Sequence, residues 1–385
     1  MNATEKKLQR RLKVAVLNRN FTPTAGGAER YSMALVEELA ALHEMHVFAQ
    51  SIDHSAPGVT YHPISQLFSK PRWLNQLWYA LATWCATRKG FDIIHSHEAV
   101  WFGNVQTMHV KTVQRSLLRG RNGWAKALRW LKIATSPRLQ TYLHLERARL
   151  KFQPKRAVVA ASQLLADELV QEYAKVSAML SVVTPGVNFP TSCATKKEAR
   201  FALSSALDGR IILFVANDYV RKGLSTLLQA MQHLPIDVRL LVVGNASQIP
   251  AFSAEAAALD LSKRVEFLGP LPDMHKAYCA ADVLCHPTLE DSYGMVVLEA
   301  MAYGVPVVVS GAAHCGLSAL LVHEQHALLL ENPQDATVLA EMLKRLLCDY
   351  SLRRELTQKA FSFAQQHTWK HAASAYGAIY QTAAK

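Results

Sequence analysis

The chain has 385 residues, half of them hydrophobic, with 19% charged and 8% aromatic. A chain of this length and composition can bury two ordinary cores, which excludes a mainly disordered protein and favours two domains. The six cysteines include no Cys-x-x-Cys pair, so they favour a reduced, cytoplasmic protein over a disulfide scaffold or a zinc module. The N-terminus lacks the apolar core of a signal peptide, and the apolar stretch 77–87 is too short to span a bilayer.

The net charge of +12 is concentrated in one segment. Residues 111–156 contain thirteen Lys and Arg but a single acid, Glu146, whereas bases and acids balance over the rest of the chain. Trp124 and Trp130 lie among these cations. The combination is typical of a contact with an anionic membrane surface or a phosphorylated glycan, with a solvated helical face as the alternative. No recognition module for nucleic acid is visible, so we expect no nucleic-acid partner.

The first half of the chain alternates short apolar strands with amphipathic helices. The apolar run at 12–18 predicts a buried parallel strand, and a glycine loop and a helix follow within 23–43. Further strands are predicted at 45–50, 91–98, 157–162 and 180–187, and His109 ends another candidate strand. This alternation indicates a doubly wound α/β domain.

The same alternation restarts after about residue 195. Strands are predicted at 209–218, 238–245, 265–270, 282–288 and 305–310, with helices between them. We therefore predict an N-terminal Rossmann-like domain over 1–192, a C-terminal one over 193–366, and a last helix within 367–385 that can pack back on the first domain. Ligands of such sheets bind outside the carboxyl ends of the strands, so two facing domains would enclose a deep cleft.

The stretch "LEDSYGMVVLEAMAYGVPVVVS", residues 289–310, places two acids around the start of a helix. Asp291 is expected in the loop and Glu299 inside the helix, where an acid among apolar residues requires a partner such as a ribose diol. The amides of Tyr293, Gly294 and Met295 would be free at the helix start and suit a phosphate. The alternative is a surface helix with solvated acids.

This stretch resembles the acid-x7-acid signature of family 4 retaining glycosyltransferases, which have the GT-B fold of two Rossmann-like domains facing across a cleft. The resemblance extends over the whole chain, through the glycine loop, the His-rich strand end, "TPGV" and "RKG". It implies that Glu299 holds the ribose of a nucleotide-sugar and that Asp291 contacts the sugar. The family usually has glutamate at the first position, and here Glu290 stands beside the aligned Asp291.

The chain contains no Asp-x-Asp metal motif, so the charge of a departing diphosphate must be met otherwise. Arg221 and Lys222 follow a strand end, and Gly223 permits close approach. A bidentate arginine and a lysine suit a diphosphate, which predicts catalysis without metal or cofactor. Many family members have arginine at the position of Asn217, and we expect Arg221 to replace it.

The remaining predicted donor contacts come from glycine-containing loops. Gly26 and Gly27 begin a helix after the first strand, and in the family this loop lies over the donor diphosphate. The full set of predicted donor-binding residues is Gly26, Gly27, Asn217, Arg221, Lys222, Gly244, Asp291, Ser292, Tyr293, Gly294, Met295 and Glu299.

The stretch "IIHSHE" contains His95 and His97 on one face of a strand. Two ligands do not make a metal site, and no third ligand is visible, so no metal is expected. The family resemblance implies that His97 contacts the donor sugar and acts with Asp291, Arg221 and Lys222 in catalysis. His95 is expected to pack in the strand, and His109 either lines the acceptor side or is structural.

These observations predict a retaining, metal-independent hexosyltransferase that uses a nucleotide-sugar, with a UDP-sugar favoured. The sequence as a whole is similar to those of bacterial lipopolysaccharide-core glycosyltransferases, which implies a lipid-linked or anionic glycan acceptor. The basic segment then implies a peripheral location on the cytoplasmic face of the inner membrane. The alternatives are a non-catalytic sugar-nucleotide-binding subunit and a sugar-nucleotide epimerase of the same fold.

Overall fold

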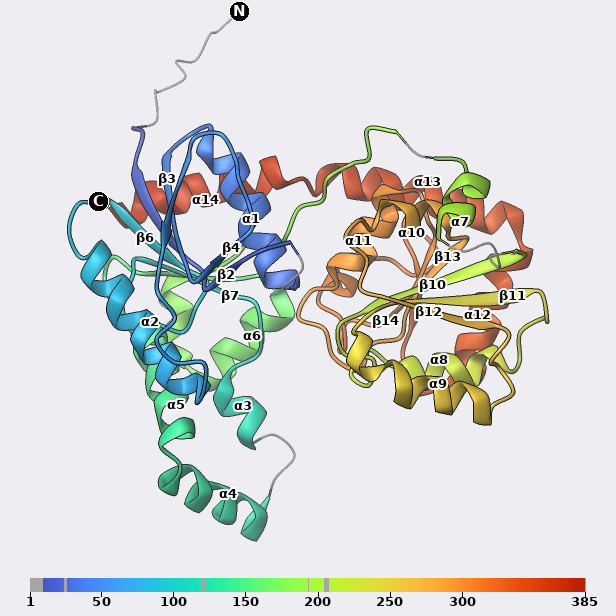
Figure 1. Cartoon of the computed structure of the whole chain (residues 1–385), viewed down its shortest axis with the longest axis horizontal. Helices are drawn as coiled ribbons and strands as arrows, with labels where there is room; N and C mark the ends of the chain where they lie inside the picture. The colour runs from blue at the N-terminus through green and yellow to red at the C-terminus, as the bar shows by residue number, and fades with distance from the viewer. Residues whose placement is uncertain (1–9, 24–25, 119–121, 193, 204–207, 385) are drawn as a thin grey trace, which may run out of the picture. The chain divides into compact units, whose positions relative to one another are not determined.

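The computed structural model describes residues 10–23, 26–118, 122–192, 194–203 and 208–384. These residues form two compact units, each built on a parallel sheet (Figure 1). The first unit contains residues up to Ala160, 166–183 and the C-terminal stretch from Ala373, and the second contains 161–165 and Thr184–Ala372. The chain thus leaves the first unit after Val183, and its last helix returns to it.

The first unit contains, among its described residues, a seven-stranded sheet of order β5-β3-β1-β6-β7-β8-β9. Its strands are β1 (Lys13–Leu17), β3 (Glu44–Ala49), β5 (Val59–Pro63), β6 (Ile93–Ser96), β7 (Val105–Met108), β8 (Ala157–Ala160) and β9 (Leu180–Val182). A small second sheet pairs β2 (Asn20–Phe21) with β4 (Ser51–Ile52). The helices are α1 (Gly27–Ala40), α2 (Arg72–Thr87), α3 (Val113–Leu118), α4 (Gly123–Thr135), α5 (Pro137–Leu150) and α6 (Gln163–Glu172), whose first residues belong to the second unit.

The second unit contains, over the part of the chain described, a six-stranded sheet of order β12-β11-β10-β13-β14-β15. Its strands are β10 (Arg210–Ala216), β11 (Val238–Gly244), β12 (Val265–Gly269), β13 (Val283–His286), β14 (Val307–Ser310) and β15 (Leu328–Leu330). Its helices are α7 (Lys196–Leu203), α8 (Leu224–Met231), α9 (Ile249–Ala258), α10 (His275–Ala280), α11 (Met295–Ala302), α12 (Ala336–Cys348) and α13 (Tyr350–Gln366). The last helix is α14 (Trp369–Ala384).

Alternation along β10 explains why its sequence is continuously apolar. Ile212 and Phe214 belong to the core on one face of the sheet, and Ile211 and Leu213 belong to the core on the other. All four side chains are fully buried. A strand covered by helices on both faces cannot alternate with polar residues, which is the pattern of a buried parallel sheet.

The expected strands at 12–18, 45–50 and 91–98 agree with β1, β3 and β6, and the candidate strand that ends at His109 corresponds to β7, which ends at Met108. The sequence did not predict β2, β4, β5 and β15. These strands are short or partly exposed and lack a strong apolar period; β5, for example, has no fully buried residue. None of the helices in the described ranges is long and apolar enough to cross a membrane.

Gly244, one of the predicted donor contacts, has a structural reason to be glycine. Its φ is +137°, and a Cβ there would lie 1.7 Å from the carbonyl oxygen of Ala216 on the neighbouring strand β10. Backbone of one strand occupies the space that any side chain would need. Glycine at this position is therefore explained without a ligand.

We expect Gly244→Ala to lower the free energy of unfolding by roughly 2–4 kcal/mol, because the substitution combines a positive φ with a clash against backbone. Gly304→Ala is a matched control in the same unit: φ is +67°, but the nearest atom is a side-chain carbon of Thr357 at 3.6 Å. The control should lose only about 1 kcal/mol. Urea unfolding followed by tryptophan fluorescence measures both variants, and equal losses would contradict the clash.

Candidate functional site

The order of the strands places the predicted donor residues at a reversal point of the second sheet. β10 lies between β11, which follows it in sequence, and β13, to which the chain returns. In open α/β sheets, ligands bind at such a point, outside the carboxyl ends of the two strands. The turn after β10 carries Lys222, and the loop after β13 carries Asp291.

Close backbone packing brings these two loops together. Leu289 N–H donates to the carbonyl oxygen of Arg221 at 2.9 Å. Gly223 has φ +78°, and a Cβ there would lie 2.0 Å from the carbonyl oxygen of Pro287. Glycine in "RKG" is thus required where one loop crosses the other, and the crossing directs Lys222 toward Asp291.

Asp291 is the centre of a buried polar cluster. Its Oδ2 lies 2.6 Å from Lys222 Nζ and 2.9 Å from His286 Nε2. The side chain of Lys222 is 14% exposed and that of Asp291 is 18% exposed. Its Oδ1 accepts from Tyr293 N–H at 3.3 Å. Burial of the carboxyl raises its pKa, but the Lys222 charge and the His286 hydrogen bond outweigh this and hold the pKa below its usual range. Asp291 is therefore ionised at neutral pH.

One expectation about this loop needs correction. The Tyr293 amide, predicted to be free for a phosphate, donates to Asp291 Oδ1 instead. Gly294 has φ +97°, and a Cβ there would lie 2.7 Å from Cys315 Sγ, so packing explains this glycine without a close ligand. The hydrogen bond from the Tyr293 amide to Asp291 Oδ1 closes an Asx turn, and this turn leads the chain into α11. Within the described part of the chain, the Ser292 side chain makes no hydrogen bond in this cluster; the Ser292 carbonyl accepts from the Ser162 hydroxyl.

The structure separates Arg221 from Lys222. The Arg221 side chain is 54% exposed and lies 3.6 Å from Asp218, three residues earlier on the same turn. Lys222 instead joins Asp291 and also donates to the Glu290 carbonyl at 3.1 Å. Asn217, at the end of β10, is exposed. Of the two predicted phosphate-binding cations, Lys222 is thus the one held against the predicted sugar-binding acid.

Glu299 lies one turn inside α11 and is partly buried. Its Oε2 accepts a hydrogen bond from the hydroxyl of Tyr278 on α10. The Tyr278 side chain is almost fully buried, so its position is fixed by the core. A carboxylate held in this way is oriented before any ligand arrives, which suits recognition of a diol.

The first unit repeats this arrangement at its own reversal point. β1 lies between β3 and β6, and Gly27 begins α1 after β1 whereas His97 follows β6. His97 N–H donates to the Leu17 carbonyl at 3.0 Å, which fixes the strand end. Gly26 has an extended backbone, φ 171°, that any residue can adopt. A Cβ at Gly26 would meet only the Glu29 side chain, so the fold does not demand glycine there.

Three histidines follow one another at this edge, of which His95 is fully buried and His97 and His109 are partly buried. His97 Nδ1 lies 2.8 Å from His109 Nε2, with the rings stacked at 5.1 Å, and His95 packs on His97 at 4.3 Å. Burial lowers the pKa of His95 and His109 to about 3 and that of His97 well below its usual value, so all three rings are neutral. Among the described residues, His97 Nε2 is a buried atom without a hydrogen-bond partner. This orphaned atom suits contact with a ligand.

A chain of hydrogen bonds explains the structural role of His95. Tyr31 donates to the Val183 carbonyl at 3.4 Å, so Tyr31 accepts from Tyr376 at 3.0 Å. Tyr376 in turn accepts from Thr107, 2.8 Å away, and Thr107 accepts from His95 Nε2 at 2.7 Å. The Val183 carbonyl at the end of this chain can only accept, so each of the three hydroxyls donates toward it. His95 must then carry its hydrogen on Nε2. His95 is a packed strand residue, as expected.

The structure divides the basic segment. Arg149 and Arg156 are buried and donate to backbone carbonyls, and Lys111 and Arg115 form ion pairs with Glu168. The single acid, Glu146, is also buried and accepts from the first amides of α3. Four cations of the segment therefore stabilise the unit itself, so only the rest of the segment can face a membrane or an acceptor. Arg119 and Arg121 lie outside the described residues.

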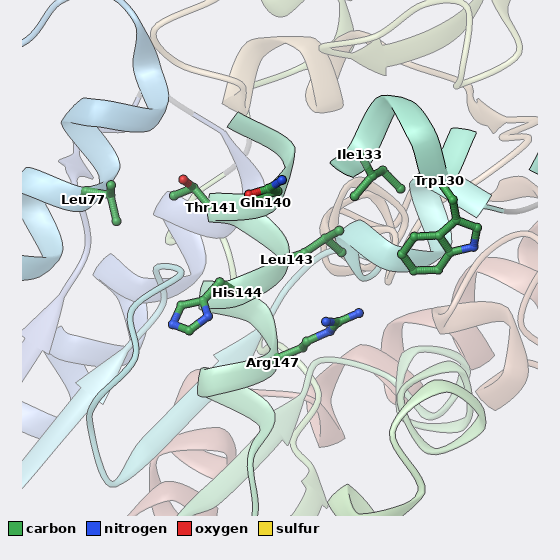
Figure 2. Close-up of a pocket in the computed structure, with 8 residues that line it drawn as sticks. All are labelled: Leu77, Trp130, Ile133, Gln140, Thr141, Leu143, His144 and Arg147. Atoms are coloured by element: carbon green, nitrogen blue, oxygen red, sulfur yellow. The ribbon is translucent and has the colours of Figure 1, made fainter. Parts of the chain in front are cut away.

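The exposed part of the segment is centred on α4, at the end of the first unit remote from its sheet (Figure 1). Trp124, Leu128 and Leu131 lie on one side of the helix and are 86%, 65% and 62% exposed. Ile133, the buried residue of α4, lies on the opposite side. A pocket of ≈ 460 Å³ is lined by residues of α2, α4 and α5, among them Leu77, Trp130 and Arg147 (Figure 2). It shares no residue with the predicted donor site.

Comparisons with known proteins agree with this architecture. Residues 195–363 match the family model described as "Glycosyl transferases group 1", and residues 25–189 match "Glycosyltransferase Family 4". A D-inositol 3-phosphate glycosyltransferase from Xylanimonas cellulosilytica is 31% identical over 325 residues, which are 77% of this chain and 73% of that protein.

Solved structures show the same fold at low sequence identity. WaaG, a glycosyltransferase involved in lipopolysaccharide biosynthesis, matches with a TM-score of 0.80 and 20% identity over 95% of this chain and 99% of its own. Anabaena Alr3699/HepE in complex with UDP and glucose matches with a TM-score of 0.74 and 17% identity over 96% and 99%. Two Rossmann-like units of this kind define an enzyme of the GT-B glycosyltransferase class. The chain belongs to glycosyltransferase family 4.

Proposed function

We propose that the protein transfers a hexose from a UDP-sugar, with retention at the anomeric carbon and without a metal, to an anionic glycan of the cell envelope such as lipopolysaccharide core. The observation that carries the proposal is the buried Lys222–Asp291 pair, 2.6 Å apart, at the reversal point of the second sheet. Glu299, oriented by Tyr278, supplies an acid for the ribose of the same donor.

The proposed chemistry needs a cation near the leaving group rather than a protein nucleophile. The bond from the anomeric carbon to the diphosphate breaks while the acceptor hydroxyl attacks from the same face, and the departing phosphate takes the hydroxyl proton. Lys222 would stabilise the charge that develops on the diphosphate, with Arg221 moving to it from the surface. The resemblance to the family also favours the N–H groups at the start of α1, with Gly26 and Gly27, as a phosphate contact. His97 would contact the sugar hydroxyls through its unpartnered Nε2.

The neighbours support a UDP-sugar and an anionic acceptor. HepE is described in complex with UDP-glucose, WaaG as a glycosyltransferase involved in lipopolysaccharide biosynthesis, and WaaB as a lipopolysaccharide outer core galactosyltransferase. The sequence relatives named for D-inositol 3-phosphate favour a second candidate acceptor, a phosphorylated polyol. Both acceptors are anionic, which agrees with the exposed cations Lys126, Lys132 and Arg147 of the first unit.

The donor is tested by calorimetric titration of the purified protein against UDP-, GDP- and ADP-sugars in the presence of EDTA. We expect one UDP-sugar to bind, and UDP release should then be followed with truncated lipopolysaccharide or inositol 3-phosphate as acceptor. Binding that requires added Mg²⁺ would contradict the metal-independent site. Release of UDP at the same rate with and without either acceptor would contradict transfer.

We also propose that α4 docks the enzyme on the cytoplasmic face of an anionic membrane. An apolar face opposite the packed side of the helix, with Lys132 beside it, is typical of a helix that lies in the interface. A triple variant with Trp124→Ser, Leu128→Ser and Leu131→Ser should bind vesicles with 30% anionic lipid at least about 10-fold more weakly.

Vesicle co-sedimentation measures this loss, and neutral vesicles and high salt should reduce wild-type binding as well. Phe201 and Ile236 of the second unit are 79% and 81% exposed, so Phe201→Ser/Ile236→Ser is a matched control that should leave binding unchanged. Equal losses in the control variant would show that α4 is not the docking surface.

A further inference from the structure

His286 is a buried histidine beside the proposed donor site, and the sequence predicted no role for it. It is the last residue of β13, and its side chain is 1% exposed. Its Nε2 lies 2.9 Å from Asp291 Oδ2. Its Nδ1 is buried and has no hydrogen-bond partner among the described residues. A buried lone pair without a partner is costly, so packing alone does not account for a histidine here.

The partner fixes the tautomer of this histidine. Asp291 is ionised, and a carboxylate accepts but does not donate, so His286 Nε2 carries the hydrogen. Burial lowers the pKa of His286 below its usual value, although the Asp291 charge opposes this, and the ring is neutral at pH 7. His286 therefore gives Asp291 a hydrogen bond without adding a second positive charge to the Lys222–Asp291 pair.

His286 and Lys222 share one oxygen of Asp291. Both bond to Oδ2, whereas Oδ1 is held by the Tyr293 amide. If Lys222 left to bind a diphosphate, the two remaining hydrogen bonds would still hold the buried carboxylate. If His286 were absent, departure of Lys222 would leave the buried Asp291 carboxylate with one hydrogen bond, from the Tyr293 amide, which is unfavourable.

We propose that His286 is a positioning residue that holds Asp291 in place and thereby allows Lys222 to exchange this carboxylate for the diphosphate of the donor. The inference rests on the proposed function, because it assumes that a nucleotide diphosphate binds beside Lys222. It assigns His286 no contact with the substrate. Its effect on the donor is transmitted through Asp291 and Lys222.

The test uses UDP as the probe and calorimetry on the full chain. His286→Leu should weaken UDP binding about tenfold, because Lys222 stays on Asp291. In His286→Gln, a neutral N–H donor should restore the affinity to within about threefold. Adding His286→Leu to Lys222→Ala should cause no further loss, because both changes act through one exchange.

Three results would overturn the inference: wild-type affinity in His286→Leu, equal losses in the Leu and Gln variants, or losses that add to that of Lys222→Ala. A merely structural histidine would lower the melting temperature but would not give the rescue or the non-additivity. If the wild type binds no UDP, the proposed function fails separately. The ¹⁵N spectrum of His286 in the wild type then decides, because an Nδ1–H tautomer would contradict the hydrogen bond that Nε2 donates to Asp291.

Discussion

Lys222→Ala is expected to lower kcat by about 10²–10³, with a smaller change in donor affinity, because the proposed role of Lys222 is strongest when charge develops on the leaving diphosphate. UDP release at saturating donor and acceptor measures this loss. The substitution also leaves the Asp291 carboxylate buried with two neutral donors, so some loss of stability is expected with it.

Two control variants separate the catalytic loss from the loss of stability. Lys222→Ala/Asp291→Asn removes the unpaired charge and should recover the stability without recovering kcat. Lys359→Ala removes an exposed lysine of α13 in the same unit and should leave kcat unchanged. Groups that stabilise the charge on a leaving group usually contribute a factor of about 10² or more to kcat. A kcat of Lys222→Ala within threefold of wild type would therefore exclude Lys222 from that role.

Glu299→Ala is expected to weaken UDP binding by about 30–100-fold, because a charged acceptor for two ribose hydroxyls is lost. The sharpest measurement compares UDP with its 2′,3′-dideoxy analogue by calorimetry. Wild type should prefer UDP strongly, whereas Glu299→Ala should bind the two nucleotides with similar affinity.

Tyr278→Phe tests the orientation of Glu299 separately, because it removes the hydroxyl that donates to Oε2 and keeps the buried ring. We expect an intermediate loss of UDP affinity, about three- to tenfold. If Glu299→Ala retained the preference for UDP over the dideoxy analogue, Glu299 would not be the ribose contact, whatever its effect on overall affinity.

Much of the fold was predictable from the sequence because both units rest on continuous apolar strands. β10, β11 and β14 each have a hydrophobic run that only burial on both faces explains. The position of Asp291 in a loop and of Glu299 in a helix followed from the glycine at residue 294 and from helical spacing beyond it. Local signals of this kind do not depend on the rest of the chain.

The contacts of the site were less predictable because they depend on which loops meet. Nothing local distinguishes Arg221 from Lys222, yet one faces solvent with Asp218 and the other is held by Asp291. The partner of Asp291 on β13, His286, gave one usable signal: a polar residue at the end of a buried strand. The burial of Arg149 and Arg156 gave none, since a count of charges does not reveal which ones the core encloses.

The return of α14 to the first unit has a consequence for biosynthesis. Tyr380 donates to His95, a residue 285 positions earlier, and Tyr376 bonds to Thr107, 269 positions earlier. These two tyrosines are fully buried, so the first unit lacks part of its core until residues 373–384 have left the ribosome. At roughly 5–20 residues per second, the delay after residue 183 is about 10–40 seconds. During this interval the second unit can complete its own sheet, so the unit that is translated first is the one that finishes folding last.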